Sequence, residues 1–220
     1  SDLKRRTIEL INEQAQRAQE GKRSRIIAKL NSLVDRRTIE ALYRASQAGV
    51  PIDLLIRGIC CLRPGLAGIS ENIRVHSIVD RFLEHSRILV FGDGNKQQVF
   101  LSSADWMPRN FDRRVEVMFP IESEELRRRI VEDILPTYLG DNVHARFLRP
   151  DGTYSHAMPG DGPTHRSQYE LLQRAAARDK ASTDTSRPSL SFEVRSDLVD
   201  GNGDGFADRS KRKKKKSSAR

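Results

Sequence analysis

Short apolar segments that favour β-structure alternate with segments of helical periodicity along most of this chain, and this alternation restricts the fold more than any other feature. Strands are predicted at 25–30, 51–57, 85–91, 99–103, 114–119 and 143–148. Helices are predicted at 3–20, 38–48, 122–139 and 167–178, with a short helical turn at 77–83. Strands that alternate with helices favour an α/β sheet with both faces covered. The nearly continuous apolar run 51–57 is typical of a strand inside such a sheet.

The alternation ends near residue 178, and residues 179–220 are rich in Ser, Asp, Gly, Lys and Arg. We expect a disordered tail there. Residues 200–220 hold eight basic and three acidic residues, so five of the nine net positive charges lie in this end. The run 209–216 could bind polyphosphate, nucleic acid or an anionic membrane, or could be a solvated tail. Residues 200–208 copy the start of an EF-hand calcium loop, but Lys211 stands where that loop needs Glu, so calcium binding is not expected.

Cysteine usage and hydropathy favour a cytoplasmic protein. Cys60 and Cys61 are adjacent, which does not make a disulfide framework. No stretch approaches 18 apolar residues, so no membrane span is expected. The sequence starts without an initiating Met or a signal-like apolar segment, and we expect it to be a piece of a longer bacterial protein.

Candidate chemistry concentrates between residues 85 and 116. His85 and Arg87 lie two positions apart on a predicted strand and should project from one face. A hairpin turn at 92–95 and a return strand ending at Ser103 and Asp105 would bring a hydroxyl and a carboxylate back to them. An imidazole beside a guanidinium suits phosphoryl chemistry, and Ser103 and Asp105 could position His85. The alternative, an ordinary histidine bound to backbone at a strand end, stays open.

Two further strand ends carry polar residues. Arg57 follows the apolar strand 51–57, at the position where open α/β sheets bind ligands. An arginine buried there without a partner would be costly, so Arg57 should bind an anion. That anion could be the phosphate of a ligand, or a carboxylate of the chain in an ordinary salt bridge. Lys29 and Asn31 lie at a similar strand end and are candidates for phosphate contact or for organising the backbone.

The segment 109–116 alternates in charge, and the remaining histidines have no phosphate-binding context. We expect Asp112 or Glu116 to hold an arginine in place more than to touch substrate. Trp106 could belong to the core. His144 precedes no second hairpin, and a catalytic role is not expected for it; the other three histidines are expected in solvent, namely His76, His156 and His165.

The pattern His-x-Arg, strand, turn and a second strand ending in Ser-Ser-x-Asp resembles one half of a phospholipase D-type site. Over about residues 3–175 the chain closely resembles the C-terminal catalytic domain of bacterial polyphosphate kinase, most densely in KLNSLVD (29–35), 41–73, SIVDRFLEHSR (77–87) and 100–117. The resemblance implies a phospholipase D-like mixed sheet covered by helices on both faces. It divides the chain into a helix leading in from a missing domain (1–22), the catalytic domain (23–178) and the basic tail (179–220).

The family makes polyphosphate reversibly from ATP through a phosphohistidine, which the resemblance places in a domain missing here. Arg57 matches the arginine that binds nucleotide phosphate, and His85 matches a second active-site histidine that binds nucleotide and acts as acid or base. Candidate phosphate contacts or supports are Lys29, Asn31, Arg87, Ser103, Asp105, Arg109, Asn110 and Arg114.

The resemblance further implies Mg²⁺ that accompanies ATP without protein ligands in this chain, and the partners ATP, ADP, polyphosphate and the preceding domains. It implies a cytoplasmic homo-oligomer with peripheral membrane association as an option, and nucleic acid is not expected as a partner. The fragment alone is expected to be inactive. Two alternatives stay open: a phospholipase D-type phosphodiesterase in which two copies of His85 face each other, and a non-enzymatic polyanion-binding module.

Overall fold

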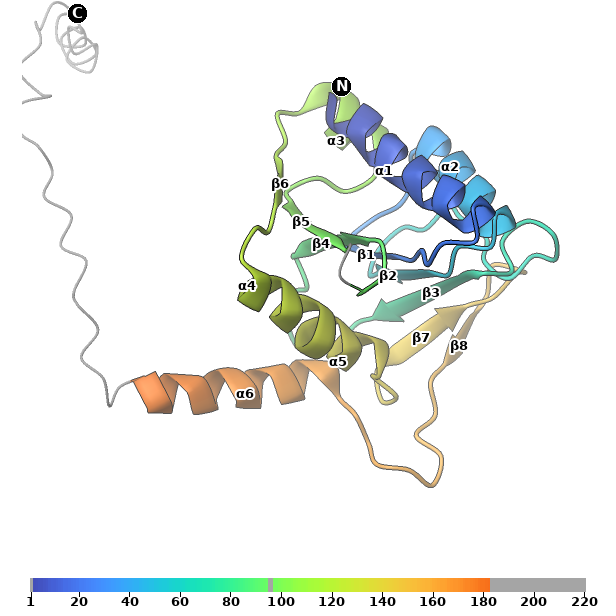
Figure 1. Ribbon diagram of the computed structural model, residues 1–220. Coiled ribbons are helices and arrows are strands. Elements are labelled where there is room, and N and C mark those ends of the chain that lie inside the picture. Colours follow the sequence, from blue (N-terminus) through green and yellow to red (C-terminus); the bar gives the residue numbers. More distant parts are fainter. Residues whose placement is uncertain (1, 95–96, 183–220) are drawn as a thin grey trace, which may run out of the picture. The chain divides into compact units, whose positions relative to one another are not determined.

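The computed structural model describes residues 2–94 and 97–182 (Figure 1). Within the described residues, those up to Asp179 form one compact unit. The predictions for the tail beyond residue 182, including the calcium-like segment and the basic run, lie outside the described residues.

Eight strands form one mixed sheet in the described part of the chain, in the order β6-β5-β4-β1-β2-β3-β7-β8. Strands β1, β2 and β3 run parallel to one another, and every other neighbouring pair is antiparallel. Their bounds are β1 (Ile26–Leu30), β2 (Ile52–Ile56), β3 (Ile73–Ile78), β4 (Arg87–Phe91), β5 (Gln98–Ser102), β6 (Met118–Pro120), β7 (Ala145–Leu148) and β8 (Tyr154–His156).

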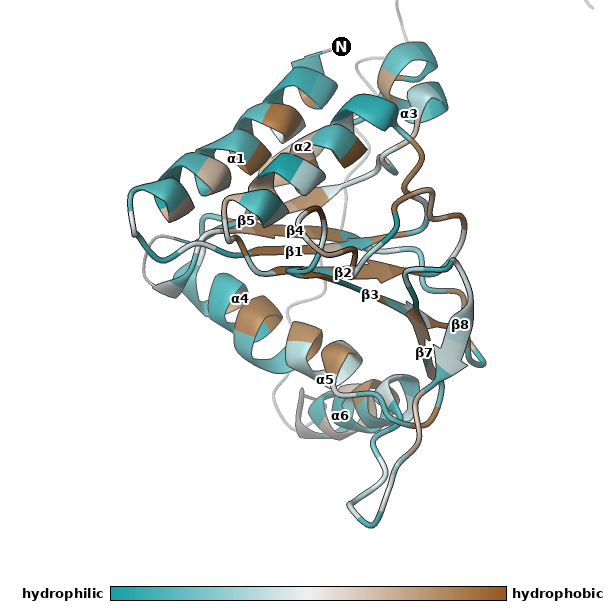
Figure 2. Ribbon diagram, turned by 90° about the vertical axis from the view of Figure 1, so that its right-hand side faces the viewer, coloured by the Kyte–Doolittle hydropathy of each residue, from teal (hydrophilic) through white to brown (hydrophobic). Residues whose placement is uncertain are grey.

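Helices cover both faces of the sheet (Figures 1 and 2). One face carries α1 (Asp2–Gln19), α2 (Arg36–Gln47) and α3 (Pro108–Arg113). The other carries α4 (Glu124–Arg128), the π-helical turn η2 (Arg129–Ile134), α5 (Leu135–Leu139) and α6 (Ser167–Ser182). The predicted fold class, a mixed sheet with helices on both faces, is confirmed.

Alternation along the central strands builds the two cores. In β1, Ala28 packs with the α1 and α2 side, whereas its neighbour Ile27 packs with Leu135 of α5 on the opposite side. In β2 the same division separates Leu54 from Leu55. Because both faces are covered, all five residues of β1 and of β2 are buried, which explains their nearly continuous apolar sequences.

Helix α1 shares the core of the sheet. Its Leu10 and Ile11 are fully buried, and they belong to the same cluster as Leu42 of α2. Asp35 caps α2 by accepting a hydrogen bond from the Thr38 backbone N–H at 3.0 Å. The proposed boundary at residue 22 and a preceding domain stay predictions.

Two sequence predictions of local structure were wrong, one strand was missed, and one predicted helix is irregular. Residues 77 and 78 end β3 and do not begin a helical turn, and 79–86 form a loop. The predicted strand 114–119 begins only at Met118, and the preceding residues include α3, which Pro108 starts. Strand β8 was not predicted. The predicted helix 122–139 is present but contains η2 just before Pro136, whose missing N–H interrupts the regular ladder.

None of the helices in the described residues is both long enough and apolar enough to cross a membrane.

Candidate active site

Four of the predicted site residues lie at one edge of the sheet. Strands β1, β2, β3 and β5 all end there, and the antiparallel strand β4 begins there. Asn31 follows β1, Arg57 follows β2, His85 precedes β4 and Asp105 follows β5. In open α/β sheets the carboxyl edge of parallel strands is where ligands bind. The structure therefore brings the ends of these segments to one edge of the sheet.

A buried ion pair fixes this edge internally. The Arg87 Nη2 lies 2.9 Å from Oδ2 of Asp105, and its Nε donates to Oδ1 at 3.2 Å. Arg87 is 8% exposed and Asp105 5%. The Asp105 carboxylate also accepts the backbone N–H of Asn31 at 2.7 Å and of Ser32 at 3.2 Å. One carboxylate thus joins the ends of β1, β4 and β5.

His85 is exposed and lies just before β4, held by Arg87. The Arg87 Nη1 donates to the His85 carbonyl oxygen at 2.9 Å and lies 3.0 Å from the ring Nδ1. Because a guanidinium can only donate, this contact favours an imidazole whose Nδ1 accepts. Asp105 contacts Arg87 and has no hydrogen bond to His85, so any positioning of His85 by Asp105 acts through the guanidinium.

Arg57 is half-buried and has no ion pair among the described residues, in contrast to the salt-bridge alternative. Its Nη2 donates to the side-chain oxygen of Asn31. Its Nε is buried, and no partner for it is present in the described part of the chain. An unsatisfied buried N–H on a cation is costly, and an anionic oxygen would satisfy it.

Lys29 is paired with a carboxylate that the sequence did not reveal. Its Nζ lies 3.0 Å from Oε2 of Glu84 and 3.0 Å from Oγ of Ser86. It also stands 4.8 Å from the centre of the Tyr138 ring, whose hydroxyl donates to Glu84 at 2.8 Å. Burial lowers the pKa of Lys29, against the attraction of Glu84, and burial raises the pKa of Tyr138.

A cavity of about 10 Å³ separates Arg57 from this buried group, and its lining includes Lys29, Glu84 and Tyr138. That volume fits about one water molecule. Lys29 of β1, Glu84 of the loop 79–86 and Tyr138 of α5 therefore line one small space together with Arg57.

Three predicted residues gather around Glu116. Ser103 donates its hydroxyl to this carboxylate, Asn110 donates to it at 2.5 Å, and the Nε of Arg114 lies 3.4 Å from it. Glu116 therefore holds an arginine in place, as expected. Arg109 is exposed and forms no ion pair within 2–94 and 97–182. Trp106 is 1% exposed and belongs to the core.

The prediction for one histidine was wrong. His76 lies on β3 at 6% exposure, with its ring edge against Phe147 at a centroid distance of 4.9 Å. Neither ring nitrogen has a hydrogen-bond partner among the described residues, and burial lowers the pKa of His76. His156 and His165 are exposed, as expected, and His144 is half-buried with Nε2 3.6 Å from Asp80.

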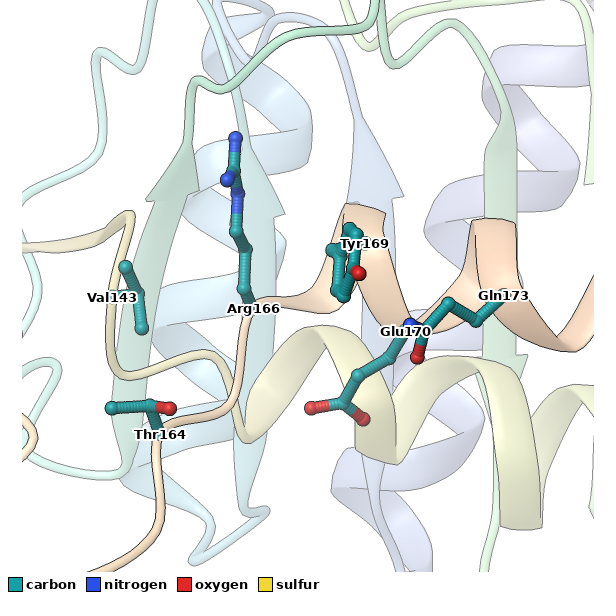
Figure 3. Close-up of a pocket in the computed structure, with 6 residues that line it drawn as sticks. All are labelled: Val143, Thr164, Arg166, Tyr169, Glu170 and Gln173. Atoms are coloured by element: carbon teal, nitrogen blue, oxygen red, sulfur yellow. The ribbon is translucent and has the colours of Figure 1, made fainter.

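A larger pocket of about 470 Å³ lies beside the start of α6 (Figure 3). Its charged lining residues are already paired. Arg166 binds both carboxylate oxygens of Asp80, at 2.7 and 2.9 Å, and Glu170 lies 3.2 Å from His165 and 3.2 Å from Arg174. These pairs leave the pocket little charge for a ligand, and the Arg166 contact ties α6 to the loop after β3.

No group of three or more His, Cys, Asp or Glu side chains that could hold a metal ion is present in 2–94 and 97–182. The expectation that Mg²⁺ enters with ATP stays a prediction.

Comparison with known proteins identifies relatives of this chain. Residues 1–168 match the family model described as polyphosphate kinase C-terminal domain 2. A polyphosphate kinase from Paraburkholderia phytofirmans is 53% identical over 165 residues, which is 75% of this chain and 24% of the relative. The crystal structure of the polyphosphate kinase from Porphyromonas gingivalis is 40% identical, with a TM-score of 0.76 over 80% of this chain and 27% of that one.

A phospholipase D family member, Nuc from Salmonella typhimurium, is 15% identical over 61% of the chain at a TM-score of 0.45, a similarity too weak to support an inference. The chain spans about a quarter of the length of the polyphosphate kinases it matches. It belongs to the polyphosphate kinase family and corresponds to the C-terminal domain of these enzymes.

Proposed function

We propose that this chain is the C-terminal part of an ATP:polyphosphate phosphotransferase, in which it binds nucleotide phosphate and supplies an acid/base histidine. The relatives are polyphosphate kinases, and the chain corresponds to about a quarter of their length. The phosphohistidine would form in a preceding domain and transfer its phosphoryl group at the edge of the sheet that carries Arg57 and His85.

The observation that carries this proposal is the unsatisfied Nε of the Arg57 guanidinium. Phosphoryl transfer depends on placing the reacting groups in line and on compensating the charge of the transferred group. Arg57 has a buried Nε without a partner in the described part of the chain, and no carboxylate neutralises it there. It is therefore available to a phosphate oxygen, with Asn31 holding its Nη2 in place.

His85 would exchange a proton with an oxygen of the reacting phosphate. The exposed ring can reach a substrate, and Arg87 fixes its Nδ1 side. Since Asp105 already neutralises Arg87, we assign Arg87 and Asp105 to support of His85 and not to phosphate binding. Lys29 is likewise neutralised by Glu84 and would act on the site through the fixed Glu84–His85 segment.

The partners of this part of the enzyme follow from the same proposal. ATP and ADP would bind at Arg57 and His85, with polyphosphate as the second substrate and the preceding domains completing the site. Mg²⁺ would be held by the nucleotide's own phosphates, where it neutralises charge. A cytoplasmic location, with peripheral membrane association as an option, and a homo-oligomeric enzyme belong to this proposal as well.

Nucleotide binding to the 220-residue chain tests the proposal. Calorimetric titration with a non-hydrolysable ATP analogue and Mg²⁺ should detect binding, and Arg57→Ala should weaken it by about 1.5–3 kcal/mol, the usual loss for a hydrogen bond to a charged group. Arg44→Ala serves as the control, because it removes an exposed arginine that lies on α2 and outside the candidate site.

Two results would contradict the proposal: no nucleotide binding by the wild-type chain, or equal affinities for Arg57→Ala and Arg44→Ala. The wild-type chain alone should form no polyphosphate from ATP, because the nucleophilic histidine lies in another domain. Polymer synthesis by the purified chain would overturn that division of roles.

A further inference from the structure

Helix α6 holds the loop that carries His85 through long-range hydrogen bonds. The bonded residues are separated in the sequence by 84 or 86 positions. Gln168, on the first turn of α6, is 4% exposed and faces this loop. Its Oε1 accepts the Phe82 backbone N–H at 2.7 Å, and its Nε2 donates to the Phe82 carbonyl oxygen at 2.9 Å. The same Nε2 lies 2.9 Å from Oε1 of Glu84. One amide therefore holds both the backbone and the residue next to His85.

Further hydrogen bonds and ion pairs hold the two ends of the loop 79–86. Just before Gln168, Arg166 binds the carboxylate of Asp80 with two hydrogen bonds, at the start of the loop. At its end, Glu84 receives Lys29 from β1 and the Tyr138 hydroxyl from α5. Glu84 is thus fixed by three different elements immediately before the candidate acid/base residue.

We propose that Gln168 is a positioning residue for His85, acting through Phe82 and Glu84. This inference rests on the proposed function of His85. A side chain must be held within a fraction of an ångström of its working geometry, and that accuracy comes from the residues that surround it. His85 is exposed and lies in a loop, so it has little packing of its own, and its position depends on the residues that hold the loop.

The chemistry of an amide suits this position. Gln offers an acceptor and two donors on one planar group, and the loop presents one N–H, one carbonyl oxygen and one carboxylate. A carboxylate at the same place could accept from the Phe82 N–H, but it could not donate to the Phe82 oxygen, and it would repel Glu84. A methyl group would satisfy none of the three contacts.

Nuclear magnetic resonance of the histidine rings in the 220-residue chain tests the inference. The chain has five histidines, and His85→Asn identifies the signal of His85. In Gln168→Ala and in Gln168→Glu, the His85 ring signal should move, because the contact between His85 and Arg87 is no longer held in one geometry. The nucleotide affinity should fall about three- to tenfold in both, as expected when one hydrogen bond from His85 to the nucleotide is weakened or lost.

Gln173→Ala, one and a half turns further along α6 (Figure 3), is the matched control and should leave the His85 signal and the affinity unchanged. Melting temperatures of all variants separate positioning from folding, and Gln168→Glu keeps the size of the side chain if the alanine variant unfolds. An unaltered His85 ring signal in a folded Gln168 variant would overturn the inference. Absence of nucleotide binding in the wild-type chain would instead refute the proposed function, while the ring signal would still decide the role of Gln168.

Discussion

The buried pair Arg87–Asp105 allows a prediction about stability that can be worked out atom by atom. In Asp105→Asn, the amide oxygen can still accept the backbone N–H groups of Asn31 and Ser32, but an NH₂ group would face the Arg87 guanidinium. Since both side chains are nearly inaccessible, the arginine would remain as a buried charge without its counterion. Breaking a buried pair in this way costs about 3–5 kcal/mol.

The reverse change should cost less. In Arg87→Met, Asp105 keeps its two backbone N–H donors, which stabilise the carboxylate without a cation. We expect a loss of about 1.5–3 kcal/mol, the range for hydrogen bonds to a charged group. The double variant should lose less than the two single losses added together, by about 1–3 kcal/mol, because its second substitution removes the charge that the first one leaves unpaired.

Urea denaturation followed by circular dichroism measures these free energies of unfolding. The exposed pair Arg36–Glu40 on α2 is the control, since its N–O distance of 2.8 Å is similar but both side chains face solvent. Glu40→Gln should cost at most about 1 kcal/mol. If Asp105→Asn costs no more than Glu40→Gln, or if the losses at Arg87 and Asp105 simply add, then the pair does not hold this edge of the sheet.

Two other positions give direct tests. The fold favours neutral His76, because burial lowers the pKa of this side chain. The free energy of unfolding should therefore be fully retained above about pH 6.5 and decrease as the pH falls toward the lowered pKa. Denaturation curves at pH 7.5 and 5.5 should show a smaller decrease for His76→Phe, and a pH dependence identical to that of the wild type would exclude His76 as its source. A Cβ at Gly58 would lie 2.8 Å from the Asn31 carbonyl oxygen. Gly58→Ala should therefore shift Asn31, destabilise the chain by about 1–3 kcal/mol and weaken nucleotide binding. Wild-type nucleotide affinity of this variant in calorimetry would contradict the role of Asn31 in holding Arg57.

The sequence predicted the strands of the sheet centre because burial on both faces leaves a local trace. Strands β1 and β2 are short apolar runs, and the polar residues directly after them, Asn31 and Arg57, could be placed at one edge from the direction of parallel strands alone. The meeting of His85, Arg87 and Asp105 was predictable for a similar reason, because a hairpin returns the chain to its starting point.

The errors arose where local sequence and long-range pairing differ. Strand β3 has an exposed arginine, Arg74, between buried neighbours and follows a loop rich in Gly and Pro, so its pairing with β2 and β7 was not apparent. Without that strand, the side of the sheet on which His76 lies could not be assigned, and a solvent position seemed the natural one. Gln168 contacts residues that lie 84 or 86 positions earlier in the sequence, and periodicity within a helix carries no information about such distant partners.

Charge pairing separates supporting cations from a binding cation at this edge. Arg87, Lys29 and Arg166 each face a carboxylate, from Asp105, Glu84 and Asp80 respectively. In each pair the two partners come from different segments, so the pairs connect strands, the loop 79–86 and α6 while adding no net charge. Arg57 lacks such a carboxylate among the described residues, and the positive charge that it contributes is therefore not cancelled locally. An anion that binds here would be attracted mainly by Arg57, which is why its substitution should affect affinity more than fold, whereas substitutions at the paired cations should affect fold first.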